Sequence, residues 1–154
     1  MLGEPHLKAL RTVCSRLEGA AINWVLTDST AFAAQGLPLQ PHDIDLQADA
    51  AGAHAIEAAL KEYMVEPVAF SSSGRIRSHF GRAILAGVRV EIMGDVEVLL
   101  PDGTWRPPPD IPRLRRWVTA GGLRLPVLPL EYECRAYLQL GRLDRAELLR
   151  RYLS

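Results

Sequence analysis

Two aspartates separated by one residue are the first candidates for chemistry in this chain. Asp43 and Asp45 lie in the stretch Pro41-His42-Asp43-Ile44-Asp45-Leu46-Gln47. Apolar and polar residues alternate there, so a β-strand would place both carboxylates on one face and Ile44 and Leu46 on the other. Two close carboxylates repel each other unless a cation lies between them, and oxygen ligands favour Mg²⁺ or Mn²⁺. The pair therefore predicts a divalent-metal site of the kind used in phosphate chemistry.

A third carboxylate and a phosphate-binding corner are predicted nearby. The stretch Val88 to Met93 alternates in the same way and places Glu91 in a strand. Upstream, the short apolar strand 23–27 runs directly into a helix formed by small residues at 31–35. Backbone N–H groups at such a helix start are free to receive a phosphate. We expect the acids Asp43, Asp45 and Glu91 to bind the metal, and the corner residues Asp28, Ser29 and Thr30 to lie at the phosphate.

Two arginines could add phosphate contacts. Arg75 and Arg77 alternate across Ile76 after the loop 71–74, so both could point at one ligand, and Arg suits bidentate phosphate binding. Each candidate also has a structural alternative. The arginines could lie on a solvated edge strand, the two aspartates could simply face water, Glu91 could pair with Arg89, and Ser29 could only cap its helix.

The order of these motifs resembles the nucleotidyltransferases of the DNA polymerase beta type, in particular their small bacterial single-domain members. That family has a strand, a Gly-Ser turn into a helix, an Asp-apolar-Asp strand and a later strand with a third acid. Residues 20–95 match this pattern through Ser29, Asp43, Asp45 and Glu91. The resemblance implies a metal-dependent enzyme that uses Mg²⁺ or Mn²⁺. It would bind a nucleoside triphosphate and transfer the nucleoside monophosphate to a hydroxyl of a small molecule, tRNA or protein.

One position departs from the family pattern. Asp28 stands where the family has glycine, and it adds bulk and negative charge where the phosphates should lie. It favours an alternative in which the chain is a weak or inactive member that binds nucleotide or a partner, such as a toxin–antitoxin component. Two other motifs do not fit their context. His42-Asp43 resembles the His-Asp pair of metal-dependent phosphohydrolases, but that pair lies on helices and this segment alternates as a strand. Residues 27–31 lack the glycines of a serine-hydrolase elbow.

The remaining pattern predicts the elements that position these residues. Apolar residues at helical spacing predict a helix over 4–18, and Asp49 should cap a second helix. Strands follow at 65–70 and in a hairpin that turns at Ala86-Gly87, and helices complete the chain over about 130–153. We expect one domain over residues 1–154 of the α/β (α+β) class. Its mixed sheet should have helices packed mainly on one side.

Composition sets the class of protein. The 154 residues are 48% hydrophobic with a formal net charge of zero, which argues against a protein that mainly coats nucleic acid. Residues 1–100 carry 12 acidic and 8 basic side chains and residues 101–154 carry 6 and 10, giving −4 and +4. Cys14 and Cys134 read as buried thiols in a reducing compartment. No apolar run could span a membrane, so we expect a cytoplasmic protein, with the apolar C-terminal helices as a possible homodimer face.

Overall fold

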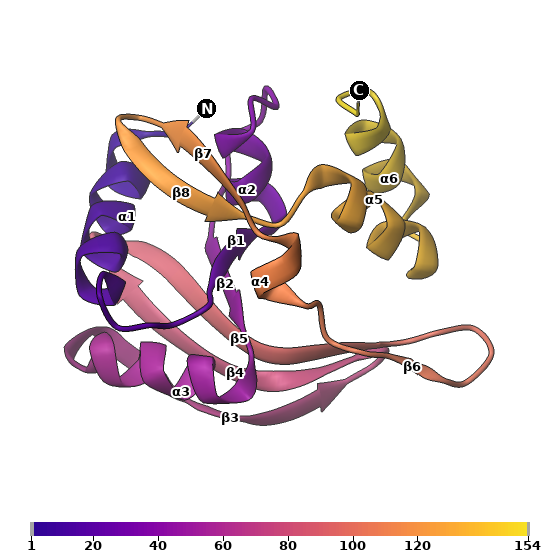
Figure 1. The fold of residues 1–154 in the computed structure, drawn as a ribbon, viewed down its shortest axis with the longest axis horizontal. Coiled ribbons are helices and arrows are strands. Elements are labelled where there is room, and N and C mark those ends of the chain that lie inside the picture. Colours follow the sequence, from indigo (N-terminus) through magenta and orange to yellow (C-terminus); the bar gives the residue numbers. More distant parts are fainter. Residues whose placement is uncertain (1, 154) are drawn as a thin grey trace.

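A computed structural model, which describes residues 2–153, is built around one eight-stranded mixed β-sheet (Figure 1). The spatial order of the strands is β3-β4-β5-β2-β1-β8-β7, and β6 pairs with β5 outside this path. The strands are β1 (Val25–Thr27), β2 (Ile44–Ala48), β3 (Met64–Ser73), β4 (Ile76–Leu85), β5 (Val88–Leu99), β6 (Trp105–Arg106), β7 (Arg116–Ala120) and β8 (Leu123–Val127).

Six α-helices and one 3₁₀ turn accompany the sheet within the described residues. They are α1 (Glu4–Leu17), α2 (Asp28–Ala34), α3 (Ala50–Ala59), η1 (Lys61–Tyr63), α4 (Ile111–Leu114), α5 (Leu130–Gln139) and α6 (Leu143–Arg150). Figure 1 shows α1 and α3 beside the curved sheet, whereas α5 and α6 stand together at the other end of the molecule. The predicted mixed sheet and helical C-terminus are confirmed.

The centre of the sheet separates apolar from polar side chains. β2 pairs in parallel with β5 and antiparallel with β1, while β8 pairs in parallel with β1. Strand side chains alternate between faces, so the fully buried residues of β2 and β5 point into the main core: Ile44, Leu46, Val90 and Ile92. Their polar neighbours in sequence consequently share the opposite face, where the acids lie.

The helices on the core face form where apolar residues recur every three or four positions. Leu10, Val13 and Leu17 of α1 are buried in the main core, and Pro5 occupies the first turn, where its missing N–H costs no hydrogen bond. Asp49 caps α3 as predicted, since its carboxylate accepts a hydrogen bond of 2.6 Å from the Gly52 N–H.

A second apolar cluster fixes the C-terminal helices. Phe32 of α2 packs with Cys134 and Tyr137 of α5 and with Leu149 of α6, whereas Ala31 belongs to the main core. Because α2 contributes to both clusters, it holds α5 and α6 in a defined place beside the sheet. Cys14 and Cys134 are both free thiols.

One local prediction agrees with the structure, one differs from it, and one hairpin was missed. The turn at Ala86 and Gly87 is confirmed, with positive φ angles of 51° and 76° that suit a two-residue hairpin. The predicted serine loop is wrong, because residues 71–73 continue β3 and pair with β4. The β7–β8 hairpin was not predicted. No helix among residues 2–153 is long and apolar enough to cross a membrane.

Candidate active site

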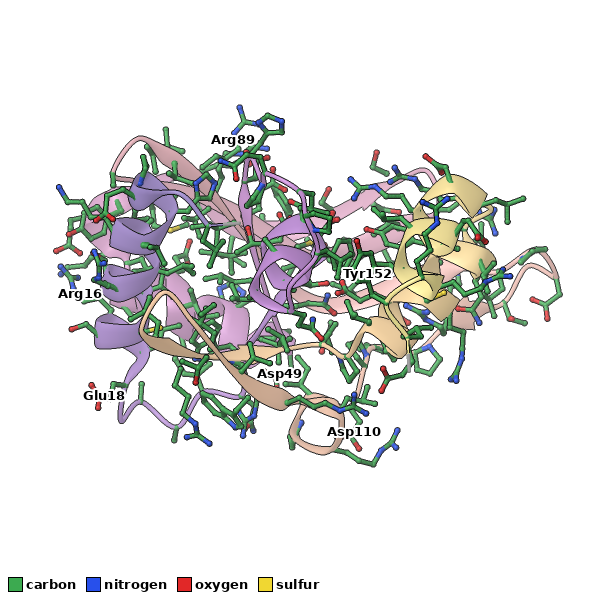
Figure 2. All side chains as sticks on the ribbon, turned by 90° about the horizontal axis from the view of Figure 1, so that it is seen from above. Arg16, Glu18, Asp49, Arg89, Asp110 and Tyr152 are labelled. Carbon is green, nitrogen blue, oxygen red and sulfur yellow. The ribbon has the colours of Figure 1, made fainter. Side chains whose placement is uncertain are left out.

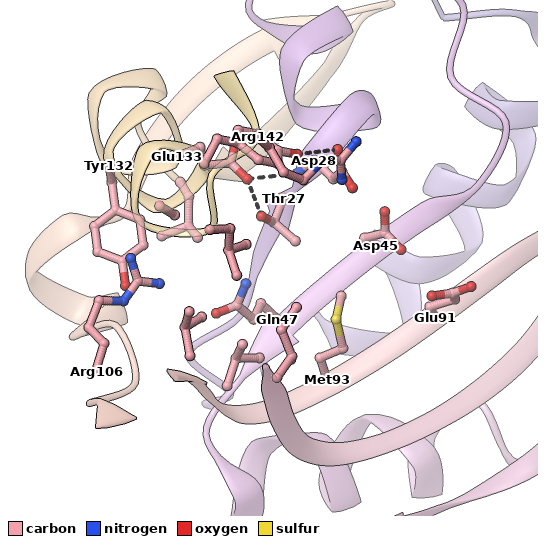
Figure 3. Close-up of a pocket in the computed structure, with 17 residues that line it drawn as sticks. Thr27, Asp28, Asp45, Gln47, Glu91, Met93, Arg106, Tyr132, Glu133 and Arg142 are labelled. Carbon is pink, nitrogen blue, oxygen red and sulfur yellow. Dashed lines mark hydrogen bonds between the residues drawn. The ribbon is translucent and has the colours of Figure 1, made fainter. Parts of the chain in front are cut away.

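Three side chains from neighbouring strands form a polar row on the open face of the sheet. Thr27 of β1 is the register partner of Asp45 in β2, and Asp45 is the register partner of Glu91 in β5. Adjacent strands lie roughly 4.8 Å apart, so residues paired in this way stand side by side on one face. Figure 3 shows Thr27, Asp45 and Glu91 along one side of a pocket. The structure thus brings Asp45 and Glu91 together as the sequence predicted.

Asp43 lies at the rim of this row. It directly precedes β2 and is half-buried, and its Oδ2 is 4.0 Å from Nη1 of Arg89. Figure 2 shows Arg89 at the outer edge of the molecule. Arg82 approaches the row from β4, with Nη2 3.9 Å from Glu91 Oε1 and Nη1 3.3 Å from Glu66 Oε2. Two arginines therefore border the acids on this side.

Burial and neighbouring negative charges dominate the electrostatics of the row. The Asp45 side chain is buried, and this burial, together with the charges of Asp28, Glu91 and Asp43, raises its pKa to about 8. Burial and the charge of Asp43 also raise the pKa of Glu91, while Arg82 and Arg89 oppose the rise. A raised carboxylate pKa here means that burial and the neighbouring negative charges disfavour the ionised form more than the nearby arginines favour it.

A divalent cation would supply that charge. Within residues 2–153, no group of three or more His, Cys, Asp or Glu side chains is already gathered as a metal site. The donor set nevertheless suits Mg²⁺, because it consists of carboxylate oxygens on adjacent strands and because burial and mutual repulsion disfavour their ionised forms. Asp43, Asp45 and Glu91 are the residues that could hold the ion.

The turn from β1 to α2 has an unusual backbone. Asp28 has a φ of 59°, in the left-handed region that glycine adopts freely and that aspartate tolerates better than most residues. This explains how an aspartate can replace the glycine of the family pattern. Its carboxylate accepts a 2.8 Å hydrogen bond from the Tyr137 hydroxyl and lies 3.8 Å from Nη1 of Arg145. The Asp28 side chain is thus held by the C-terminal helices.

Glu133 of α5 binds the same turn. Its Oε1 accepts hydrogen bonds from the Thr27 hydroxyl and, at 2.8 Å, from the Asp28 backbone N–H. The other oxygen, Oε2, is buried without a hydrogen-bond partner among the described residues. Burial raises the pKa of Glu133 to about 8, and the charges of Asp28 and Asp45 add to the rise. A carboxylate 105 residues away therefore fixes the phosphate corner predicted from sequence.

The other residues predicted to contact the nucleotide differ in burial and in their hydrogen-bond partners. Ser29 is half-buried and its hydroxyl makes no hydrogen bond within residues 2–153, whereas Thr30 is fully buried and donates a 2.7 Å hydrogen bond to the Asp43 carbonyl. Arg75 donates to the Leu99 carbonyl, and Arg77 pairs with a glutamate of β5 at 3.0 Å. Neither arginine lines the pocket beside the acids.

The acids open into a pocket of about 230 Å³ between the sheet and α5 (Figure 3). Sequence analysis missed several of its polar residues, which are Thr27, Gln47, Arg106, Tyr132, Glu133, Tyr137 and Arg142. Two signals could have found some of them. Gln47 follows Asp45 at the strand period, and Glu133 interrupts the apolar stripe formed by Leu130, Cys134 and Tyr137 on α5.

The sequence model of one family, described as aminoglycoside-2″-adenylyltransferase, matches residues 9–150. The chain belongs to this family. The match covers the acid row, the Asp28 turn and both C-terminal helices. It therefore confirms the predicted resemblance to nucleotidyltransferases beyond the motif region at 20–95.

Solved structures agree with membership of the aminoglycoside-2″-adenylyltransferase family. TM1012 from Thermotoga maritima, provisionally assigned as a nucleotidyltransferase, is 47% identical with a TM-score of 0.87, covering 99% of this chain and 94% of its own. The lincomycin-bound lincosamide adenylyltransferase LnuA shares the fold at 13% identity and a TM-score of 0.62, with 97% of each chain covered.

A third structure also shares the fold of this adenylyltransferase family. It is ANT(2″)-Ia in complex with adenylyl-2″-tobramycin, at 9% identity and a TM-score of 0.59, covering 94% of this chain and 87% of the other. None of the curated proteins compared matches the chain. The assignment thus rests on the family model and on the Thermotoga protein, while the two distant structures show the fold.

Proposed function

We propose that this chain is a Mg²⁺-dependent nucleotidyltransferase that moves the adenylyl group of ATP to a hydroxyl acceptor and releases pyrophosphate. The observation that carries the proposal is the pairing of Asp45 with Glu91 on the open face of the sheet, next to the Asp28 turn and a pocket. Family membership supports adenylyl transfer as the reaction class.

Each group has a role that follows from its position. Asp43, Asp45 and Glu91 would hold Mg²⁺ (or Mn²⁺), which would neutralise phosphate charge and acidify the acceptor hydroxyl. Asp28, Ser29 and Thr30 would form the corner that receives the phosphates; Glu133 holds the Asp28 N–H, Ser29 would offer its hydroxyl and backbone N–H at the start of α2, and Thr30 ties the corner to Asp43. Arg75 and Arg77 would act from the hairpin at the pocket's border, as longer-range positive charge.

The acceptor is proposed to be a small molecule. LnuA is a lincosamide antibiotic adenylyltransferase with lincomycin bound, and ANT(2″)-Ia was captured with adenylyl-2″-tobramycin.

A single assay tests the reaction. The purified chain would be incubated with Mg²⁺, ATP and panels of hydroxyl-bearing small molecules, and pyrophosphate release would be measured. We expect acceptor-dependent release that Asp45→Asn lowers by roughly a thousandfold, the equivalent of about 4 kcal/mol of transition-state stabilisation. Release that persists in Asp45→Asn would reject the assigned site.

A second candidate function follows from Asp28. Its negative charge lies next to Asp45 and opposes phosphate binding, which favours a member that binds nucleotide or a partner chain without turnover, as in a toxin–antitoxin pair. Nucleotide binding with Mg²⁺ in calorimetry, but no pyrophosphate release with any acceptor, would favour this alternative.

A further inference from the structure

A buried glutamine in the pocket has no protein partner. Gln47 follows Asp45 by two residues in β2, so its side chain lies on the same face about 7 Å farther along the strand. The residue is only 7% exposed and lines the pocket, yet its amide makes no hydrogen bond within residues 2–153. Among the described residues, the amide atoms are not among the fully buried atoms that lack a partner, so they are open to the pocket. The free donor and acceptor of Gln47 therefore point to a ligand.

Arg106 supplies a cation at the far end of the pocket. Its Nη1 donates a 2.7 Å hydrogen bond to Gln139 Oε1, and its guanidinium carbon lies 5.1 Å from the centre of the Tyr132 ring. These contacts fix the side chain, but its buried Nε has no partner among the described residues. Figure 3 shows Arg106 and Tyr132 at the end opposite Asp45 and Glu91, with Gln47 between the two ends.

The charges of the pocket indicate what kind of group can bind at the Arg106 end. The lining carboxylates gather at the phosphate corner and the acid row, and the far end carries the cation Arg106 between largely apolar walls: Ile76, Met93, Val96, Val98, Leu128 and Leu140. An amine-rich acceptor would be repelled by Arg106. A flat uncharged ring with hydrogen-bonding edges would instead satisfy both the walls and the Gln47 amide.

The distance from the acids agrees with a nucleotide. A phosphate held beside Asp45 places the attached sugar and base along the pocket toward Gln47 and Arg106. A volume of about 230 Å³ leaves room for one nucleoside-sized group rather than for a trisaccharide. The amide of Gln47 offers the donor and acceptor that pair with the amino group and adjacent ring nitrogen of adenine.

We propose that Gln47 and Arg106 recognise the adenine base of the nucleotide and so determine nucleotide specificity. The inference rests on the proposed function. Gln47 pairs with the 6-amino group and a neighbouring ring nitrogen, and the guanidinium of Arg106 lies beside the far edge of the base. Tyr132 holds the guanidinium plane, and the acceptor enters from the acid end.

Calorimetry with two probes tests the proposal. In the presence of Mg²⁺, the chain would be titrated with α,β-methylene ATP, which has the base, and with inorganic tripolyphosphate, which lacks it. We expect Gln47→Leu and Arg106→Met each to weaken binding of the ATP analogue about tenfold, the loss of one or two hydrogen bonds, and to leave tripolyphosphate binding unchanged. Gln40→Leu makes the same chemical change at an exposed position and should alter neither affinity.

Thermal unfolding separates recognition from folding. Gln47→Leu should unfold at or above the wild-type temperature, because it removes an amide that has no protein partner. Wild-type affinity for the ATP analogue in both variants, or an equal loss for both probes, would overturn base recognition. A wild-type chain that binds neither probe with Mg²⁺ would instead contradict the proposed function itself.

Discussion

At the scale of single residues, Asp28 combines a backbone role with an electrostatic one. Its left-handed φ of 59° turns β1 into α2, and its carboxylate, held by Tyr137, raises the pKa of Asp45 and Glu91. Burial and the charge of Asp28 also raise the pKa of the Tyr137 hydroxyl, which therefore stays protonated and donates. The residue thus combines a firm contact to α5 with a negative charge beside the acid row.

Removing the charge of Asp28 should strengthen nucleotide binding. A negative charge about 4 to 6 Å from a phosphate costs on the order of 1 kcal/mol, so Asp28→Asn and Asp28→Gly should bind triphosphate roughly fivefold more tightly with Mg²⁺ in calorimetry. Asn keeps the size of the side chain, so it separates charge from backbone effects. Unchanged affinity in both variants would show that the carboxylate acts only on Tyr137 and the turn.

The raised pKa values predict how stability depends on pH. The pKa of Asp45 is about 8 in the native chain against an ordinary value of 3.8, and that of Glu133 is about 8 against 4.5. The native state therefore keeps protons that the unfolded chain releases, so both groups make stability fall as pH rises from about 4 to about 8. Melting temperatures without Mg²⁺ should drop across this range.

Neutral variants isolate the two groups. In Asp45→Asn and Glu133→Gln the drop in melting temperature between pH 5 and pH 8 should be smaller than in the wild type. Asp144→Asn, which changes an exposed carboxylate that has no ion pair within residues 2–153, serves as the control. A wild-type slope that both variants share would show that other groups set the pH dependence.

At the scale of secondary-structure elements, α5 completes the site that β1, β2 and β5 begin. Glu133 reaches across to Thr27 and Asp28, and Tyr137, one helical turn later, binds the Asp28 carboxylate. Residues at i and i+4 share a helix face, so one face of α5 supplies both contacts. The second apolar cluster keeps that face against the turn.

Loss of the Glu133 carboxylate should destabilise the turn. Glu133→Ala leaves the Thr27 hydroxyl and the Asp28 N–H unpaired and opens a small cavity, so we expect a cost of about 2 to 4 kcal/mol in urea unfolding. Glu133→Gln retains an acceptor oxygen and should recover most of that loss at pH 8. Equal destabilisation by Ala and Gln would mean that the charge itself stabilises the turn.

Arg142, at the start of α6, is expected to attract the phosphates. It lines the pocket and contacts the Tyr137 ring at 5.5 Å, but no carboxylate pairs with it within residues 2–153. Arg142→Ala should therefore weaken tripolyphosphate binding with Mg²⁺ about fivefold. Arg150→Ala, which removes a charge paired with Glu147 on the same helix, should have little effect. Equal effects of the two variants would indicate general attraction rather than a contact.

At the scale of the whole molecule, the uneven charge of the chain is brought to one pocket. The acidic half, residues 1–100, supplies the carboxylates of the row, and the basic half supplies Arg106 and Arg142. In the proposed function, the ion would lie on the acids and the arginines would lie beside base and phosphate. The formal net charge of zero does not reveal this separation of charge.

Mg²⁺ should stabilise the whole chain at alkaline pH. At pH 8 an ion that binds only the native acids raises the free energy of unfolding by mass action, by about 2.7 kcal/mol at a hundredfold excess over its dissociation constant. The melting temperature should therefore rise. The shift should disappear in Asp45→Asn and on addition of EDTA. A shift that survives in Asp45→Asn would place the ion elsewhere on the molecule.

The sequence alone determined the elements near the site and its central acids. Alternation in β2 and β5 set the faces of Asp45 and Glu91, and helical spacing set α1 and α5, because these periods depend on local backbone geometry. Only the tertiary structure decided that Glu133, Tyr137, Gln47 and Arg106 belong to the same site. Their contacts join residues as far as 109 positions apart, and such contacts depend on how apolar clusters pack α2 against α5. The β7–β8 hairpin escaped prediction for the same reason, since β8 forms by pairing with the distant β1.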